Sequence, residues 1–73
     1  MNYVEYIEIR SEKHFGTPCI KGTRISVHDV LNWLSNGMTS QQIIEDFNEI
    51  NEQMINACIA FAADKEHKLK IAS

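Results

Sequence analysis

Residues 15–27, FGTPCIKGTRISV, gather most of the residue types in this chain that could do chemistry. Glycines, a cysteine, a lysine and an arginine together suit a phosphate-binding loop, a metal site or a tight turn. A phosphate-binding loop needs its lysine directly after the second glycine, so that the ammonium reaches phosphates cradled by backbone amides. Here Lys21 precedes Gly22. We therefore predict a turn and no nucleotide-binding site.

The side chains that could bind a metal are scattered along the chain. His14, Cys19 and His28 are near one another in sequence, but no paired spacing such as Cys-x-x-Cys or His-x-x-x-His links them. Cys58 and His67 lie far from this group. Isolated cysteines of this kind usually act as small core residues. We expect no metal and no other cofactor.

The residue types of a catalytic triad are present but badly spaced. Ser26, His28 and Asp29 are close neighbours at a predicted helix start, where their side chains point in divergent directions. Glu45 and Asp46 are adjacent, and adjacent helical residues do not face one site. We therefore predict that the chain is not an enzyme and has no small-molecule substrate.

The elements that carry these residues are predicted to be a short β arm followed by three helices. Apolar and polar residues alternate over Tyr6–Ile9, which predicts a strand. Pro18–Ile20 and Thr23–Ile25 flank Lys21 and Gly22, and glycine allows the positive φ of a tight turn. A small hairpin or looped-back arm is the expected result. The whole chain, 1–73, is interpreted as one domain with an arm at 1–25 and a helical bundle at 26–70.

Three helix starts carry the same local signal. Ser26 and Thr39 each precede an Asp or Gln at the third helical position, the pattern of a capping box, and Asn51 is a third cap residue. An apolar residue before each cap residue can pack against a second apolar residue at the start of the helix. Gly37 ends the first helix. The expected helices are Val27–Asn36, Ser40–Phe47 and Glu52–Lys70. The last two have the outline of a helix-turn-helix.

The third helix is apolar on all sides over Ala57–Ala63. A helix without a polar face is covered on more than one side. The second cover is either the arm, a second copy of the chain or another protein. We expect a homodimer formed through this face or the arm, with Cys58 and Phe61 as partner contacts.

Charge is unevenly distributed along the chain, whose net charge is −3. No lysine or arginine occurs between Ile25 and Ala63, an interval that contains Asp29, Glu45, Asp46, Glu49 and Glu52. DNA affinity depends on neutralising phosphates with basic side chains, so this surface would repel DNA. Gln53 and Asn56 could nevertheless address adenine edges in the major groove. The expected DNA contacts, if DNA is bound, are Arg10, Lys13, Lys21 and Arg24 on the arm, together with Gln53 and Asn56.

Size and composition bear on the stability and the cellular location of the chain. A chain of 73 residues buries only about 60% of its unfolded surface, so a partner would add useful stability. No apolar run approaches the ~20 residues of a membrane span. No secretory signal is recognised, and the two cysteines show no disulfide framework. These features predict a bacterial cytoplasmic protein with reduced thiols and no membrane contact.

The run Gly16–Val27, with the later Gly37–Thr39, Gln42–Ile44 and Ile55–Ala62, resembles a small bacterial family catalogued as domain of unknown function 433 (DUF433). The resemblance covers about residues 6–64. Thr17 and Asn48 depart from it, because the family usually has lysine and proline there. It implies a mainly α, homeodomain-like three-helix bundle with an N-terminal β extension and no catalytic residues.

Members of that family often resemble antitoxins. The resemblance therefore implies a non-catalytic module that binds and inhibits a PIN-like toxin nuclease encoded nearby. Such nucleases gather acidic side chains around a divalent metal, which Lys21 and Arg24 would complement. Alternatively, Arg24 pairs with Asp29, Glu45 or Asp46 and only holds the arm in place. The second functional hypothesis is a dimeric transcriptional regulator that binds operator DNA through its helix-turn-helix.

Overall fold

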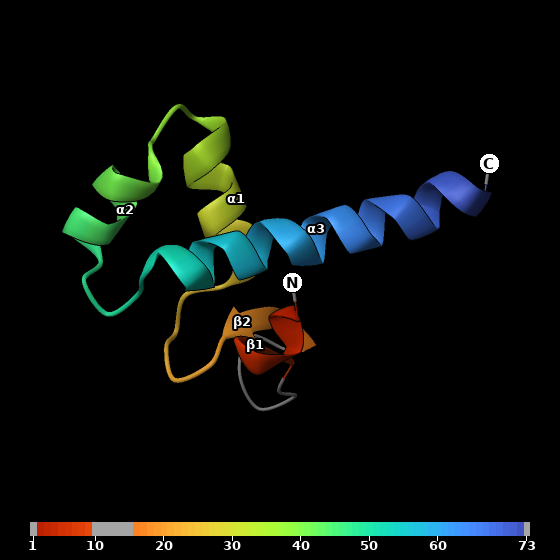
Figure 1. Cartoon of the computed structure of the whole chain (residues 1–73), viewed down its shortest axis with the longest axis horizontal. Coiled ribbons are helices and arrows are strands. Elements are labelled where there is room, and N and C mark those ends of the chain that lie inside the picture. The colour runs from red at the N-terminus through yellow and green to blue at the C-terminus, as the bar shows by residue number, and fades with distance from the viewer. Residues whose placement is uncertain (1, 10–15, 73) are drawn as a thin grey trace.

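The computed structural model describes residues 2–9 and 16–72, with side chains up to residue 66. Within these ranges the chain is mainly helical, as predicted (Figure 1). A short antiparallel pair of strands comes first along the chain, and three α-helices follow it. The helix starts agree with the sequence-based expectations, and the helix ends differ by one or two residues. The elements in order are a 3-10 turn η1 (Tyr3–Glu5), β1 (Ile7–Ile9), β2 (Pro18–Ile20), α1 (Val27–Ser35), α2 (Ser40–Asp46) and α3 (Glu52–Ala72).

Each helix begins at a residue whose side-chain oxygen caps it. At α1 the amide of Asp29 donates to Ser26 Oγ at 3.0 Å, and the Asp29 carboxylate accepts from the Ser26 amide at 3.2 Å. The same reciprocal pair joins Thr39 and Gln42 at α2, at 3.1 and 2.9 Å. At α3, Asn51 Oδ1 accepts from the amide three residues on, at 2.9 Å. The predicted caps are confirmed, because these bonds satisfy backbone donors that a helix start otherwise leaves without partners.

The strands form a two-stranded antiparallel sheet that pairs Ile7 with Ile20 and Ile9 with Pro18. After β2 the chain turns back at Gly22, and the Ile20 amide donates to the Ile25 carbonyl at 2.9 Å. β2 is thus held on one side by β1 and on the other by the returning chain. The sequence analysis predicted the looped-back arm, but it did not identify β1 as the strand partner of β2.

The core lies where the hairpin and the three helices meet. Its fully buried side chains come from all of these elements and are Ile20, Val30, Ile43, Ile55 and Cys58. In Figure 1, α1 and α2 lie above α3, while η1 and the hairpin lie below it. α3 contacts α1, α2 and η1. The first half of α3 is therefore covered from two sides, which explains why its sequence lacks a polar face.

The N-terminal segment supplies part of this cover. The Tyr3 ring meets the Phe61 ring edge-on, with centroids 5.4 Å apart, and the Tyr3 hydroxyl donates to Asp64 Oδ2 at 2.7 Å. This bond and partial burial raise the pKa of Tyr3. The sequence left open whether the arm, a second copy or another protein covers the apolar helix. Within the chain, the arm does so. Ile59 remains 45% exposed on the outer side of α3.

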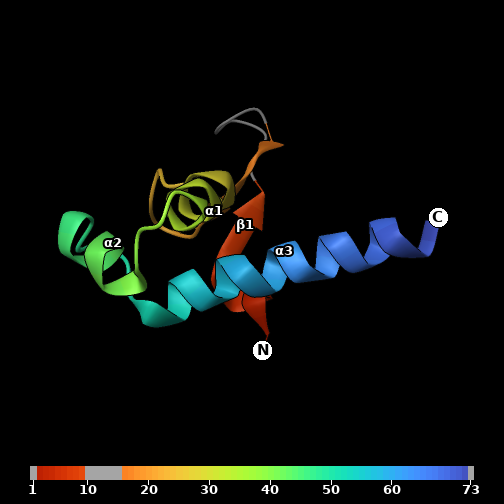
Figure 2. The ribbon, with the colours of Figure 1, turned by 90° about the horizontal axis from the view of Figure 1, so that it is seen from above.

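Farther along, α3 extends beyond the rest of the molecule in both views (Figures 1 and 2). Within the described residues, no helix has the length and apolar character required to cross a membrane.

Candidate partner-binding site

The turn between β2 and α1 carries two of the predicted partner contacts, Lys21 and Arg24. Gly22 at its centre has a φ of 79°, a conformation that favours glycine. The Lys21 amide donates to the Tyr6 carbonyl at 2.8 Å, which ties the turn to the residue before β1. The side chains of Lys21 and Arg24 are both exposed. The turn therefore presents two cations on a backbone that is held on both sides.

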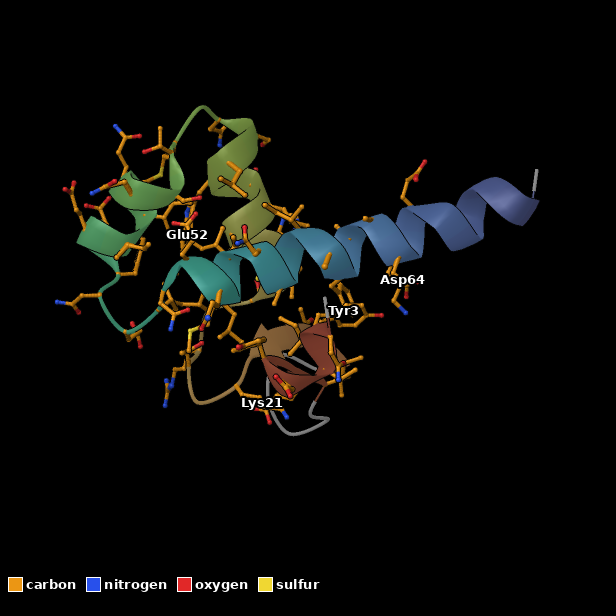
Figure 3. All side chains as sticks on the ribbon, in the orientation of Figure 1. Tyr3, Lys21, Glu52 and Asp64 are labelled. Carbon is orange, nitrogen blue, oxygen red and sulfur yellow. The ribbon has the colours of Figure 1, made fainter. Side chains whose placement is uncertain are left out.

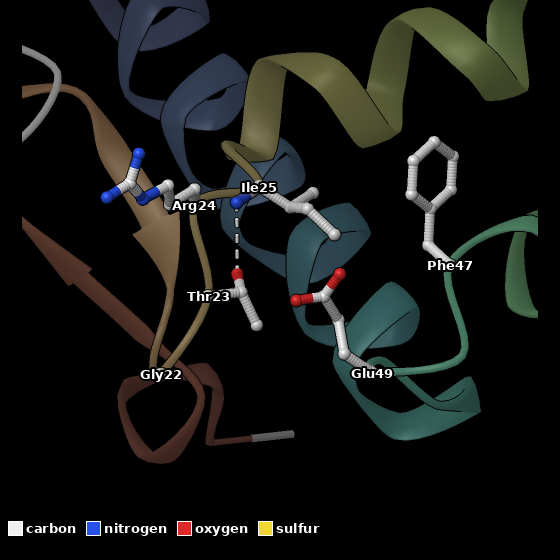
Figure 4. A pocket seen from close by; sticks show the side chains of 6 residues that line it. All are labelled: Gly22, Thr23, Arg24, Ile25, Phe47 and Glu49. Atoms are coloured by element: carbon white, nitrogen blue, oxygen red, sulfur yellow. Dashed lines mark hydrogen bonds between the residues drawn. The ribbon is translucent and has the colours of Figure 1, made fainter.

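Thr23, between the two cations, is the residue that closes this turn. Its side chain is only 7% exposed. Its hydroxyl donates to the Ile20 carbonyl at 2.9 Å. It also accepts from the Ile25 amide at 3.0 Å, the bond drawn in Figure 4. A buried hydroxyl with both bonds made restricts the backbone as a short cross-link would. Sequence reasoning missed this role, and the only signal was a threonine directly after the turn glycine.

Arg24 is the second cation of the turn, and its possible ion pairs can be followed in the described residues. The Asp29 carboxylate is engaged with the Ser26 amide. Within the described part of the chain, no ion pair joins Arg24 to Asp29, Glu45 or Asp46. Figure 4 shows the Arg24 guanidinium pointing away from the nearby Glu49 carboxylate. The alternative in which Arg24 pairs with one of these carboxylates is therefore not seen among the described residues, and the Arg24 side chain is exposed.

An open groove of about 490 Å³ lies beside the turn. The turn forms one wall, and the connection between α2 and α3 forms the other, with Phe47 and Glu49 (Figure 4). Phe47 is stacked on Trp33, with ring centroids 4.4 Å apart and planes 11° from parallel. Because Phe47 and the buried Ile25 supply apolar walls, the groove can accept apolar as well as charged groups.

The predicted DNA-reading residues lie on α3. Gln53 and Asn56 are exposed on the first turns of α3, next to Glu52. Figure 3 shows Glu52 at the start of α3 and Lys21 well away on the hairpin side. Among the described residues, no hydrogen bond or ion pair joins Gln53 or Asn56 to Lys21. Arg10 and Lys13, the other predicted basic contacts, lie outside the described residues.

The predicted contacts on α3, Cys58 and Phe61, differ in burial. Cys58 is fully buried in the core, so a protein that docks on the folded chain cannot touch it. Burial also raises the pKa of the Cys58 thiol to about 11. Its assignment as a partner contact is corrected to a core residue, in line with the usual behaviour of free cysteines. Phe61 is half-buried and packs edge-on against the Tyr3 ring.

No cluster of three or more His, Cys, Asp or Glu side chains suited to a metal occurs among the residues that the structure describes. Ser26 and Asp29, which were considered as triad members, are occupied with the α1 cap. The described site presents two exposed cations beside a groove.

A family model described as "Protein of unknown function (DUF433)" matches residues 7–62. The chain belongs to the DUF433 family. The resemblance drawn from the sequence is thereby confirmed, with nearly the same limits. The matched part includes both strands, the Lys21–Arg24 turn, α1, α2 and the first half of α3. No curated protein and no solved structure matches the chain.

Proposed function

We propose that this DUF433 chain is a non-catalytic binding module, the antitoxin of a toxin–antitoxin pair, and that it binds and inhibits a PIN-like nuclease encoded nearby. The observation that carries the proposal is the Lys21–Arg24 turn. It holds two exposed cations on a backbone fixed by the buried Thr23 hydroxyl.

The charge of the turn fits the proposed partner. A nuclease that gathers carboxylates around a divalent metal has a strongly negative site, and a cation placed there complements it. Arg24 suits this role because its guanidinium can bind a carboxylate through two parallel hydrogen bonds. No ion pair within the described part of the chain competes for it.

The rigidity of the turn also favours binding. On association, ordering a flexible loop costs about 1–2 kcal/mol for each residue whose backbone becomes fixed, in addition to about 0.5–1.5 kcal/mol for each immobilised side chain. Here Gly22, Thr23 and the bond from Lys21 to Tyr6 have ordered the backbone before any partner arrives. The partner then orders only the two side chains.

The test is binding and inhibition of the nuclease encoded by the neighbouring gene, measured by calorimetry and by RNA cleavage. Charge reversal in Arg24→Glu and Lys21→Glu is expected to weaken binding by about tenfold or more each, since interfacial charge pairs couple by about 1.5 kcal/mol or more. Lys70→Ala, near the end of α3, is the control with one cation fewer. Unchanged affinity of the folded double variant Lys21→Glu/Arg24→Glu would contradict the proposal.

The alternative proposal is a dimeric, homeodomain-like regulator that binds operator DNA through a helix-turn-helix formed by α2 and α3. It is favoured by the short connection between these helices and by the exposure of Gln53 and Asn56 on the first turns of α3. Against it stand the exposed acids Glu45, Asp46, Glu49 and Glu52 around that helix start.

Titration of a fluorescent operator duplex separates the two proposals. Binding that disappears in Gln53→Ala and Asn56→Ala but survives in Lys21→Ala/Arg24→Ala would support DNA reading by α3. A sedimentation experiment on Phe61→Asp tests the dimer at the same time, because a carboxylate buried in an interface without a partner disrupts it. A single species with the monomer mass in the parent chain would remove the dimer from this proposal.

A further inference from the structure

A second concave site lies at the other end of β2 from the Lys21–Arg24 turn. It is an open hollow of about 300 Å³, bounded by the start of β2, the first turns of α1 and the middle of α3. Val27 and Leu31 line it from α1, and Phe61 and Ala62 line it from α3. Its size is at the lower end of ligand-binding pockets, and it suits one large apolar side chain.

The rim of this hollow is basic, with His28 on α1 and Lys65 on α3. Both side chains are exposed. Lys65 Nζ lies over the Phe61 ring, 5.3 Å from its centre, a cation–π contact that places the ammonium beside the apolar floor of the hollow. Among the described residues, neither His28 nor Lys65 forms an ion pair.

The carboxylates that the structure describes near this hollow are directed elsewhere. Asp29 accepts from the Ser26 amide at 3.2 Å, and Asp64 accepts from the Tyr3 hydroxyl at 2.7 Å (Figure 3). Glu66 follows Lys65 directly, and adjacent helical residues do not face the same side. An apolar floor therefore lies under a rim of basic character.

We infer that this hollow is a docking site for an acidic protein segment in which a large apolar side chain stands next to a carboxylate. The apolar side chain fills the space over Leu31, Phe61 and Ala62, and the carboxylate meets Lys65 or His28. A single buried anchor with a charged neighbour is the arrangement that dominates many protein interfaces. Charge complementarity selects an acidic segment over a basic one.

The inference goes beyond the proposed function by adding a second contact, and it rests on that proposal in taking the partner to be a protein with an acidic surface. β2 is three residues long, so about 10 Å of strand separates the hollow from Lys21. One partner surface can therefore reach both sites. Two linked contacts raise the affinity above that of either alone.

The first experiment uses a probe peptide and the whole chain. A short acetylated peptide with one phenylalanine between aspartates is titrated into the protein, and methyl signals of Val27, Leu31 and Ala62 are followed by NMR. Saturable shifts of these methyls are expected. Replacing the peptide's phenylalanine by alanine, or its aspartates by lysines, is expected to weaken binding by about fivefold or more.

The second experiment uses matched variants. Ala62→Phe places a ring in the hollow, whereas Ala63→Phe adds the same ring at the next position, which is exposed and outside it. Ala62→Phe and Lys65→Glu are expected to abolish the peptide-induced shifts, and Ala63→Phe to leave them. In binding to the neighbouring nuclease, Ala62→Phe is expected to lower the affinity about tenfold relative to Ala63→Phe.

Several results would overturn the inference. These are the absence of saturable shifts, equal binding of the lysine-flanked peptide, or shifts centred on the Lys21–Arg24 amides. Tighter binding of decanoate at the same methyls would assign the hollow to an acyl anion. A dimer lost in Ala62→Phe but kept in Ala63→Phe would assign it to a second copy.

Failure of this inference is distinguishable from failure of the proposed function. If Arg24→Glu weakens nuclease binding but Ala62→Phe does not, and the peptide does not bind, the hollow has no docking role and the antitoxin proposal stands. If the peptide binds as expected and no nuclease is bound or inhibited, the docking site stands and the antitoxin proposal fails.

Discussion

Replacing Thr23 with valine keeps the shape of the side chain and removes the hydroxyl that closes the Lys21–Arg24 turn. The hydroxyl makes two bonds, to the Ile20 carbonyl at 2.9 Å and from the Ile25 amide at 3.0 Å. The Ile20 carbonyl keeps another donor, the Thr23 amide at 3.1 Å. The Ile25 amide, on a buried residue, is left without its acceptor.

The expected loss follows from these two effects. An orphaned buried donor costs about 1–3 kcal/mol, whereas the bond to a carbonyl that keeps a second donor contributes about 1 kcal/mol or less. We expect Thr23→Val to lower the free energy of unfolding by about 2–3 kcal/mol. A domain of this size has about 4–11 kcal/mol in total, so the change is large.

The measurement is urea denaturation followed by circular dichroism, with amide hydrogen exchange at Ile25. With a slope of about 1–2 kcal/mol per molar urea, the midpoint is expected to fall by about 1–3 M. Thr23→Ser is the control, because it keeps the hydroxyl and loses one methyl, a change of about 1 kcal/mol.

The same variant tests the site. Thr23→Val alters no charge, yet a looser turn must be ordered on binding, so we expect weaker binding of the partner nuclease at a temperature where the variant is folded. Equal stability of the valine and serine variants, together with unchanged protection of the Ile25 amide, would refute the reasoning about the turn.

Three further predictions concern the rest of the chain. Ser26→Ala is expected to lower the stability by about 1–2 kcal/mol and Thr39→Ala by less, because Ser26 is buried and Thr39 is exposed; calorimetry of the two variants checks the order. Ile43→Ala is expected to lower it by about 2–5 kcal/mol, which moves the urea midpoint down by about 1 M or more, whereas a cooperative transition near the parent midpoint would contradict the assigned core. Burial raises the pKa of Cys58 from 9.0 to about 11, so the thiol of the unfolded chain loses its proton at a lower pH than the thiol of the folded chain. The free energy of unfolding should therefore fall as the pH rises between these values. This part of the pH dependence should be missing in Cys58→Ala, and its persistence there would exclude the thiol as the cause.

The local features of this protein could be predicted from its sequence. Helix starts depend on bonds between residues three positions apart, so Ser26 with Asp29 and Thr39 with Gln42 were sufficient to place α1 and α2. The positive φ of Gly22 follows in the same way from the residue types around it. The family, too, followed from a contiguous run of residues.

Other features depended on packing between distant segments. Tyr3 bonds to Asp64 across 61 positions and packs on the Phe61 ring, and only such long-range contacts show that the N-terminal segment covers the apolar helix. Cys58 and Phe61 are three residues apart on α3, yet one is fully buried and the other is half-buried beside Tyr3. A helical pattern alone does not say which of them an arm from elsewhere in the chain will cover.

The candidate site shows the same division. The sequence by itself determined that Lys21 and Arg24 flank a tight turn and that the middle of the chain is acidic, because turn chemistry and charge are properties of the residues. Tertiary structure alone decided that Thr23 is buried, that Arg24 is left without an acidic partner in the described part of the chain, and that α1, α3 and β2 enclose a hollow. Burial and charge pairing depend on which surfaces meet when the chain folds, and residues far apart in the sequence provide those surfaces.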